Sequence, residues 1–313
     1  MRKPLTILLL MLAVCQARPN ADDTLYDDID ENEVRQIDVD SSEVPKIPKL
    51  SSHEKWNMIR ASGQDPMKRR RKNKNQTEPN KGRNRRDLLL APWRIQQTVP
   101  KRPPPPAKKA LALPVDVCPP KFDAITKGYN GRTYVFARER VYQIWYEDGL
   151  PQKASFLINE LFAGGPRTVT AALTNNRSGV TVLFDGRTAY RFRWNRKLKR
   201  FQLGRNTPQP LPRNITITPQ AGFEWADGNQ VLLSGEHFII YDAYWNLATF
   251  TGHTRRYFPN LPRDLLGIIY NSGDNVLLMY TKSNKLKVYN VKKFRVVQEY
   301  PLKLNEFVGC LSH

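Results

Sequence analysis

Residues 122–136, FDAITKGYNGRTYVF, open a pattern that recurs three more times before the end of the chain. The four copies start near Phe122, Val169, Pro219 and Asp264, so the period is roughly 45 to 50 residues. Each copy holds a small residue, then an apolar run, a turn and a second strand-like segment. The apolar runs are residues 134–136, 182–184, 231–233 and 276–278. A period of this length, with one strand-rich unit in each copy, predicts an all-β fold, a four-bladed β-propeller.

Turn dipeptides separate the strand-like segments of this region. They are Asn130-Gly131, Asp185-Gly186, Asp227-Gly228 and Ser272-Gly273. Asn-Gly and Asp-Gly between such segments are strong hairpin signals. Residues 190–194, YRFRW, alternate so that three aromatic side chains should share one face of a strand and two arginines the other. A short helical turn is expected at residues 154–161.

At these residues the sequence resembles the hemopexin-like repeat family. Residues 122–136 are similar to the opening of a blade in that family, and residues 258–268, FPNLPRDLLGI, resemble its link from one blade to the next. Residues 161–172 are a looser copy of the same link. The resemblance covers residues 118–313 and implies one propeller like the C-terminal domain of matrix metalloproteinases, here without a protease domain.

The chain has three cysteines. Cys15 lies in a predicted signal peptide, and its removal leaves Cys118 and Cys310, which would form either one disulfide or two free thiols. The single disulfide of the hemopexin-like family joins the first blade to the end of the fourth. Cys118 and Cys310 stand in those places, so the resemblance implies that they are bonded.

The same family often has Asp before the small residue of each blade. Only Asp123 keeps it here, and the other copies have Thr170, Gln220 and Leu266. Such domains often hold an ion in the central channel through backbone carbonyls near this position. The resemblance therefore implies a channel ion, Ca²⁺ or Na⁺, beside these four residues, and a channel without an ion is the alternative.

The region before the propeller divides into two predicted segments. Residues 1–17 have a charged start, an apolar run and a small-residue cleavage site, which are typical of a secretory signal peptide. Residues 18–117 are acidic first and then basic and Pro-rich, and we expect them to form a disordered leader. No later apolar run is long enough to span a membrane. The chain is therefore predicted to be secreted and extracellular.

Two kinds of covalent processing are predicted from short motifs. Arg83, Arg85 and Arg86 before Asp87 resemble a furin-type cleavage site in an exposed segment. Sequons for N-glycosylation begin at Asn75, Asn176 and Asn214, and Asn176 is expected in an exposed turn.

The sequence shows no catalytic motif. No histidine among the four stands in a His-Glu-x-x-His arrangement, and neither a Gly-x-Ser-x-Gly element nor a phosphate-binding loop is present. We therefore predict that the chain is not an enzyme. His237 and His253 are the candidates for axial haem ligands. Haem is not expected, because in the haem-carrying relative the site lies between two propellers, and no other cofactor is predicted.

A dense basic cluster in the second copy is the best candidate binding surface. It comprises Arg187, Arg191, Arg193, Arg196, Lys197, Lys199 and Arg200. Clustered arginine suits contact with sulfate or phosphate, and sulfated glycosaminoglycans are the main extracellular polyanions. A solvated basic face is the alternative. Nucleic acid would satisfy the same charge pattern but is not expected outside the cell.

These observations favour a secreted, non-enzymatic binding protein that engages extracellular matrix, a glycosaminoglycan or a protein partner. Two alternatives remain open at this point. One is a haem or metal-ion carrier. The other is a non-catalytic regulator that competes with matrix metalloproteinases.

Overall fold

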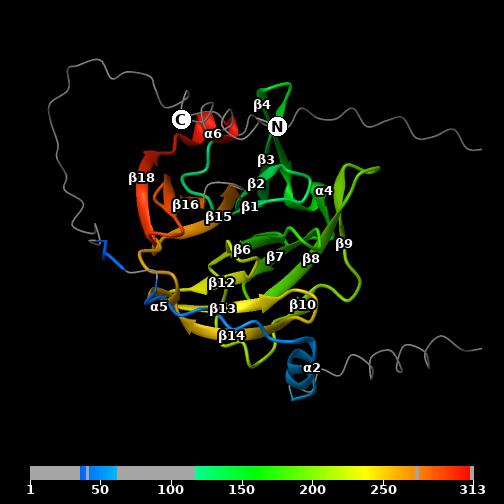
Figure 1. Ribbon diagram of the computed structural model, residues 1–313. Coiled ribbons are helices and arrows are strands. Elements are labelled where there is room, and N and C mark those ends of the chain that lie inside the picture. The colour runs from blue at the N-terminus through cyan, green and yellow to red at the C-terminus, as the bar shows by residue number, and fades with distance from the viewer. Residues whose placement is uncertain (1–35, 40–41, 62–116, 272–274, 311–313) are drawn as a thin grey trace, which may run out of the picture. The chain divides into compact units, whose positions relative to one another are not determined.

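A computed structural model describes residues 36–39, 42–61, 117–271 and 275–310 (Figure 1). The predicted signal peptide, the sequon at Asn75 and the processing residues Arg83, Arg85 and Arg86 lie outside the described residues.

Four antiparallel sheets follow one another along the chain. The first contains β1 (Ala124–Lys127), β2 (Thr133–Ala137), β3 (Arg140–Glu147) and β4 (Leu150–Leu157). The second contains β6 (Ala171–Asn175), β7 (Val180–Asp185), β8 (Thr188–Asn195) and β9 (Arg200–Leu203), with β5 (Phe162–Ala163) parallel to β9 and β10 (Gln209–Pro210) paired to β8. The third contains β11 (Ala221–Glu224), β12 (Gln230–Ser234), β13 (His237–Asp242) and β14 (Leu247–His253). The fourth contains β15 (Leu265–Asn271), β16 (Val276–Thr281), β17 (Lys285–Asn290) and β18 (Arg295–Pro301).

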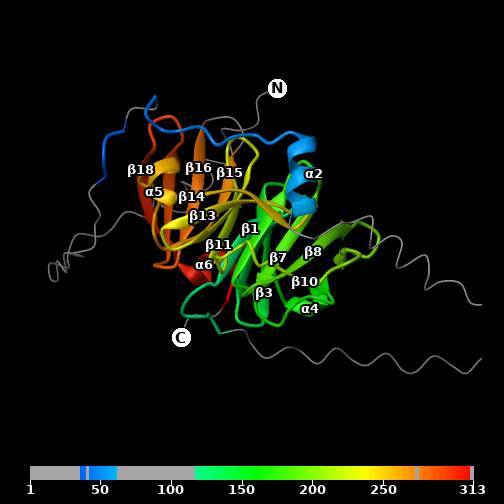
Figure 2. The same ribbon diagram turned by 90° about the horizontal axis from the view of Figure 1, so that it is seen from below.

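The sheets are the blades of a propeller. The first strands, β1, β6, β11 and β15, contact one another around a common axis. Figure 1 shows the last strands, β4, β9, β14 and β18, at the outside, and Figure 2 shows the same blades from below. The predicted four-bladed β-propeller is thereby confirmed.

Each seam between neighbouring blades has its own apolar core. Pairs of fully or nearly fully buried residues that represent the four seams are Phe136 and Phe192, Leu173 and Ile239, Phe223 and Leu277, and Val135 and Tyr280. The alternating strand pattern supplies them, because residues that point to opposite faces of one blade enter two different seams. Every blade is thus stabilised by two neighbours.

The seam between the first and last blades also carries a covalent bond. Cys118 and Cys310, separated by 192 residues in the sequence, form a disulfide. The helix α6 (Leu304–Val308) ends just before Cys310, and its Phe307 stacks on Tyr280 at 5.4 Å between ring centroids. The closure therefore combines a disulfide with aromatic packing.

Two short helices lie near the blade links. They are α4 (Ile158–Leu161) and α5 (Thr254–Tyr257). The helical turn expected at residues 154–161 is wrong in its first half, because Ala154 pairs with Gln143 inside the β3–β4 ladder. Strand pairing across the hairpin outweighs the local preference of that segment.

The leader is not structureless throughout the part that the structure describes. Residues 36–39 and 42–51 belong to the same compact unit as the propeller. In a separate unit, Ser52–Ala61 form the helix α2, with Glu54 in its first turn and Arg60 in its last. These charges complement the helix dipole, and no Gly or Pro interrupts the segment. No helix within the described ranges is long and apolar enough to cross a membrane.

Candidate polyanion-binding site

The strand β8 presents an aromatic face to the core and a basic face outward. Phe192 is fully buried in the seam between the first and second blades, and Tyr190 and Trp194 pack against the same core. Arg193 is exposed on the other face. The predicted alternation along residues 190–194 is confirmed. The buried face fixes the strand and so fixes the point from which the basic side chains leave.

The turn from β8 to β9 is held by one asparagine. The Asn195 side-chain oxygen accepts the backbone N–H groups of Lys197 at 3.0 Å and Leu198 at 3.1 Å. The Asn195 side-chain nitrogen donates to Oε1 of Gln202 at 3.0 Å. Lys199 completes the turn with a φ of 49°. The main chain of this turn is therefore defined by its own hydrogen bonds.

The same turn recurs in two other blades. Asp242 accepts the N–H groups of Tyr244 and Trp245, and Asn290 accepts those of Lys292 and Lys293. The turn of the third blade carries no Lys or Arg, whereas that of the fourth blade carries Lys292, Lys293 and Arg295.

Five cations surround the turn after β8, and we call them the basic turn. They are Arg193, Arg196, Lys197, Lys199 and Arg200, and all five are exposed. Their side chains form no ion pair or hydrogen bond with another residue that the structure describes. No Asp or Glu occurs between Arg187 and Thr207. The charges of the basic turn are therefore not neutralised by neighbours in sequence.

Arg187, predicted to belong to the same cluster, has another role. Its guanidinium donates to the carbonyl oxygens of Ile217 at 2.7 Å, Ile215 at 2.5 Å and Pro212 at 3.3 Å. It thereby holds the segment that leads from the second blade to the third. Its guanidinium N–H groups are therefore engaged by main-chain oxygens of the protein itself.

Arg191 is also committed to the protein itself. It donates to the carbonyl oxygens of Ala243 at 2.9 Å and Tyr244 at 3.4 Å, and to Oε1 of Gln209. These contacts connect β8 with the third blade. The seven predicted polyanion-binding residues thus divide into two internal braces and the five residues of the basic turn.

The side chains of three residues predicted beside the channel cap hairpins. Side-chain oxygens of Asp123, Thr170 and Gln220 accept the backbone N–H groups of Arg138, Gly186 and Gly235, at 2.7, 3.2 and 3.2 Å. In the fourth blade the equivalent residue is Asp264, which accepts the N–H of Ser283 at 3.2 Å. Comparison of the four sequence copies placed Leu266 there, and an irregular register between Leu265 and Gly267 explains the offset.

The first strands approach one another closely around the axis. A β-carbon added to Gly267 would lie 2.5 Å from the carbonyl oxygen of Ile125, and one added to Gly222 would lie 2.9 Å from that of Ala172. Within the described part of the chain, no group of three His, Cys, Asp or Glu residues could hold a metal ion. Main-chain oxygens, the ligands that the family resemblance implies, are a type that Ca²⁺ accepts. The channel ion stays a prediction.

The two histidines considered for haem lie together. His237 and His253 are opposite each other on β13 and β14, both exposed, with ring centroids 4.5 Å apart. Two axial ligands must stand on opposite faces of the macrocycle. Rings in mutual contact leave no room for haem between them, so this pair does not fit a bis-histidine site.

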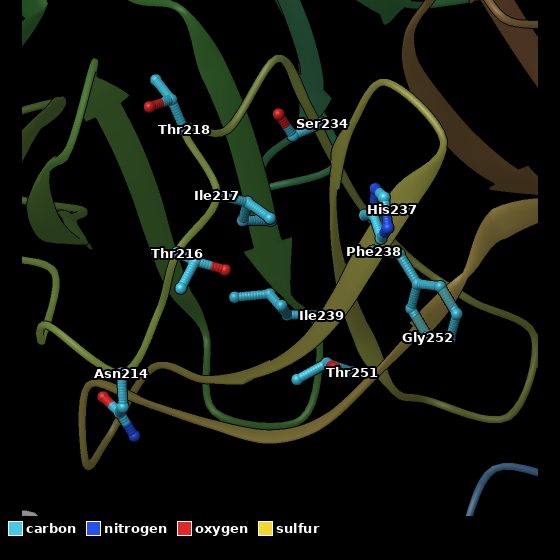
Figure 3. Close-up of a pocket in the computed structure, with 10 residues that line it drawn as sticks. All are labelled: Asn214, Thr216, Ile217, Thr218, Ser234, His237, Phe238, Ile239, Thr251 and Gly252. Atoms are coloured by element: carbon cyan, nitrogen blue, oxygen red, sulfur yellow. The ribbon is translucent and has the colours of Figure 1, made fainter.

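A cavity of about 460 Å³ lies beside these strands. Figure 3 shows one side of it lined by Asn214, Thr216, Ile217 and Thr218, and the other by His237, Phe238 and Gly252. The described lining includes no Lys, Arg, Asp or Glu, so the cavity offers neutral hydrogen-bonding groups and no charge for a polyanion.

The two sequons within the described residues differ in their surroundings. Asn176 is exposed in a turn, but its side-chain nitrogen donates to Oε1 of Glu224 at 3.2 Å and its backbone N–H to Oε2 at 2.9 Å. Burial raises the pKa of Glu224, and the hydrogen bonds from Asn176 only partly offset this. Asn214 is exposed at the edge of the cavity and has no such partner among the described residues.

The chain is similar in sequence to part of a known protein. No protein-family model matches the chain. Matrix metalloproteinase-C of Caenorhabditis elegans is 34% identical over 134 residues, which cover 42% of this chain and 23% of that protein. The match thus spans about a quarter of the relative's length. Two solved structures are similar at a lower level: the hemopexin fold protein CP4 from cow pea (13% identity, TM-score 0.48, covering 59% of this chain and 94% of that one) and a 2S albumin seed protein from Dolichos (11%, 0.49, 61% and 97%).

The described fold is a propeller of four blades whose first and last blades are joined by a disulfide. The metalloproteinase relative and this architecture support the resemblance of the propeller region to a hemopexin-like domain.

Proposed function

We propose that this chain is a secreted, non-enzymatic binding protein whose propeller engages a sulfated glycosaminoglycan of the extracellular matrix through the basic turn. The single observation that carries the proposal is the set of five exposed cations without an ion-pair partner in the described structure. The disulfide and the metalloproteinase relative support an extracellular location.

The physical chemistry of the basic turn suits a sulfated chain. Arg193, Arg196 and Arg200 offer planar guanidinium groups that can bind two sulfate oxygens at once. Lys197 and Lys199 add charge to the same short segment. The packed aromatic face of β8 keeps the turn in place, so little ordering of the main chain is needed on binding.

The test is retention of the full chain on immobilised heparin. One variant replaces all five residues of the basic turn with Gln, and a charge-matched control replaces the basic run of the leader, Lys68 to Lys72. We expect the basic-turn variant to elute at lower salt than the unaltered protein, because exposed charge contacts are screened as the Debye length falls from ~10 Å at 0.1 M to ~3 Å at 1 M salt.

The two variants separate the competing interpretations. If only the leader variant elutes earlier, the polyanion binds to the leader and the proposal is wrong. Thermal unfolding of both variants serves as the folding control. All five substituted side chains of the basic turn are exposed, so its melting temperature should stay close to that of the unaltered protein.

A second candidate is favoured by the metalloproteinase relative. In this case the propeller binds a protein that a metalloproteinase propeller also binds, and it acts as a non-catalytic competitor. A competition assay would add the chain to a metalloproteinase and its immobilised propeller ligand. Loss of the enzyme from the ligand supports this function, and undiminished binding at a large excess of the chain excludes it for that ligand.

A further inference from the structure

A short piece of the leader contacts the link between the third and fourth blades. The backbone N–H of Ile37 donates to the side-chain oxygen of Asn260 at 2.9 Å. In return, the side-chain nitrogen of Asn260 donates to the carbonyl oxygen of Ile37 at 2.7 Å. A neighbouring β-strand would form the same two hydrogen bonds with the main chain of residue 37. Asn260 therefore recognises an extended main chain and not a particular side chain.

Asn260 is prepared for this contact by the propeller itself. Its side-chain nitrogen also donates to the carbonyl oxygen of Phe294 at 2.8 Å, which orients the amide. Its backbone has a φ of 56°, a conformation that Asn tolerates better than most residues.

The residues on either side of Ile37 meet the edge strand β18. The N–H of Val296 donates to Oε1 of Gln36 at 3.0 Å. Arg295 forms an ion pair with Asp38 at 3.5 Å between Nη1 and Oδ1. An open strand edge offers unpaired backbone groups, and here the leader uses one of them.

Further along the leader, an apolar contact follows the polar ones. Ile47 packs against the core of the seam between the third and fourth blades. The Ile37 side chain, in contrast, is 69% exposed. The contact at residue 37 therefore depends on its main chain. Burial of an apolar side chain contributes at residue 47.

We propose that Asn260, Arg295 and Val296 form a docking site for an extended acidic peptide, and that the described residues 36–39 and 42–47 of this chain are its occupant. In such a peptide, the residue after the one that pairs with Asn260 would carry the carboxylate that meets Arg295, as Asp38 does here. As a consequence, the acidic segment stays on the propeller when the chain is cut between residue 61 and residue 117. This proposal does not depend on the polyanion site, which lies in a different blade.

The test needs a cut in the leader that leaves both the docked segment and the propeller intact. A recognition sequence for a site-specific protease replaces residues 75–81 of the full chain, and the cut protein is examined by size-exclusion chromatography and mass spectrometry. Before the cut, the tether keeps the segment at a high effective concentration. After it, only the contacts hold the segment, so co-elution measures their strength.

A matched pair of substitutions tests the main-chain pairing. Ile37→Pro removes the N–H that Asn260 accepts, whereas Ile37→Ala keeps it and changes only an exposed side chain. We expect the N-terminal fragment to co-elute with the propeller in the unaltered protein and in Ile37→Ala. In Ile37→Pro we expect it to separate, with an affinity at least about tenfold lower.

A second variant tests the same contact from the propeller side. Asn260→Gly removes the amide and keeps a residue that adopts positive φ without strain. Release of the fragment is expected here too. If the fragment separates in the unaltered protein, or if it stays bound in Ile37→Pro, the docking proposal is overturned. Ile37→Pro decides this even if Asn260→Gly does not fold, because residue 37 lies in the leader.

Discussion

At the scale of single residues, two arginines two positions apart on one strand have unrelated roles. Arg191 donates to main-chain oxygens of the third blade, whereas the Arg193 side chain has no partner in the described structure. The alternation in the sequence places both arginines on the same face of β8 and predicts both as polyanion-binding residues. Their difference arises from a turn of the next blade, which lies 52 residues further along the chain.

The two arginines should therefore respond differently to the same substitution. Arg191→Gln loses charge-assisted hydrogen bonds to carbonyls and should lower the free energy of unfolding by about 1.5 to 3 kcal/mol. Arg193→Gln should change it by less than about 0.5 kcal/mol. Urea denaturation of both variants measures this difference. Equal stability of the two would contradict the role of Arg191 as a brace.

Gly267 offers a second test at this scale. A β-carbon at this position would meet the Ile125 carbonyl oxygen at 2.5 Å, so Gly267→Ala must push two first strands apart. We expect a loss of about 1 to 3 kcal/mol in the free energy of unfolding. Gly222→Ala, with its closest contact at 2.9 Å, should cost less. An unfolding midpoint of Gly267→Ala equal to that of the unaltered protein would show that the axis is looser than described.

At the scale of strands and turns, much of the fold is predictable from the sequence. Period, turn dipeptides and alternation predict four blades and the inward face of residues 190–194. The offset at Leu266 was not predictable, because an irregular strand register changes which residue caps the hairpin without changing the apolar pattern. The pairing of Ala154 in β4 was missed for a similar reason, since it depends on the partner strand.

Lys285 and Lys287 of β17 both contact the carboxylate of Glu299 on β18. Burial acts to raise the pKa of Glu299, but the hydrogen bonds and charges of Lys285 and Lys287 outweigh it and lower the pKa. A carboxylate with a lower pKa in the folded chain stabilises the fold above its unfolded pKa. That contribution is lost as the pH falls through the folded pKa.

Glu299→Gln should therefore lower the free energy of unfolding at pH 7 by less than about 1 kcal/mol, because the group is partly exposed. The difference from the unaltered protein should shrink as the pH falls below the folded pKa of Glu299. Glu236→Gln is the control, since its ion pairs are long, at 3.7 and 4.0 Å. Urea titrations across the acidic range measure both. A loss that is independent of pH would contradict the ion-pair explanation.

At the scale of the whole molecule, ring closure depends on two independent contributions. The disulfide restricts the unfolded chain, and by chain entropy alone it is worth at most about 5 kcal/mol. The apolar seam of Phe122, Tyr280 and Phe307 remains when the disulfide is removed.

The double variant Cys118→Ser with Cys310→Ser should therefore still fold, with a free energy of unfolding lower by a few kcal/mol. Circular dichroism in buffer shows whether the double variant folds, and urea denaturation measures its free energy of unfolding. A double variant without native secondary structure in buffer would show that the seam cannot close the ring alone.

The central claim is that the propeller binds polyanions at the basic turn, and protection of individual lysines from acetylation tests it most directly. Lys197 and Lys199 lie in the basic turn. Lys292 and Lys293 lie in the equivalent turn of the fourth blade, where they are also exposed and where an asparagine makes the same contacts. The full chain is acetylated with and without a heparin oligosaccharide, and each lysine is quantified by mass spectrometry. We predict that heparin protects Lys197 and Lys199 and leaves Lys292 and Lys293 reactive. Equal protection of both turns, or none at Lys197 and Lys199, would contradict the account.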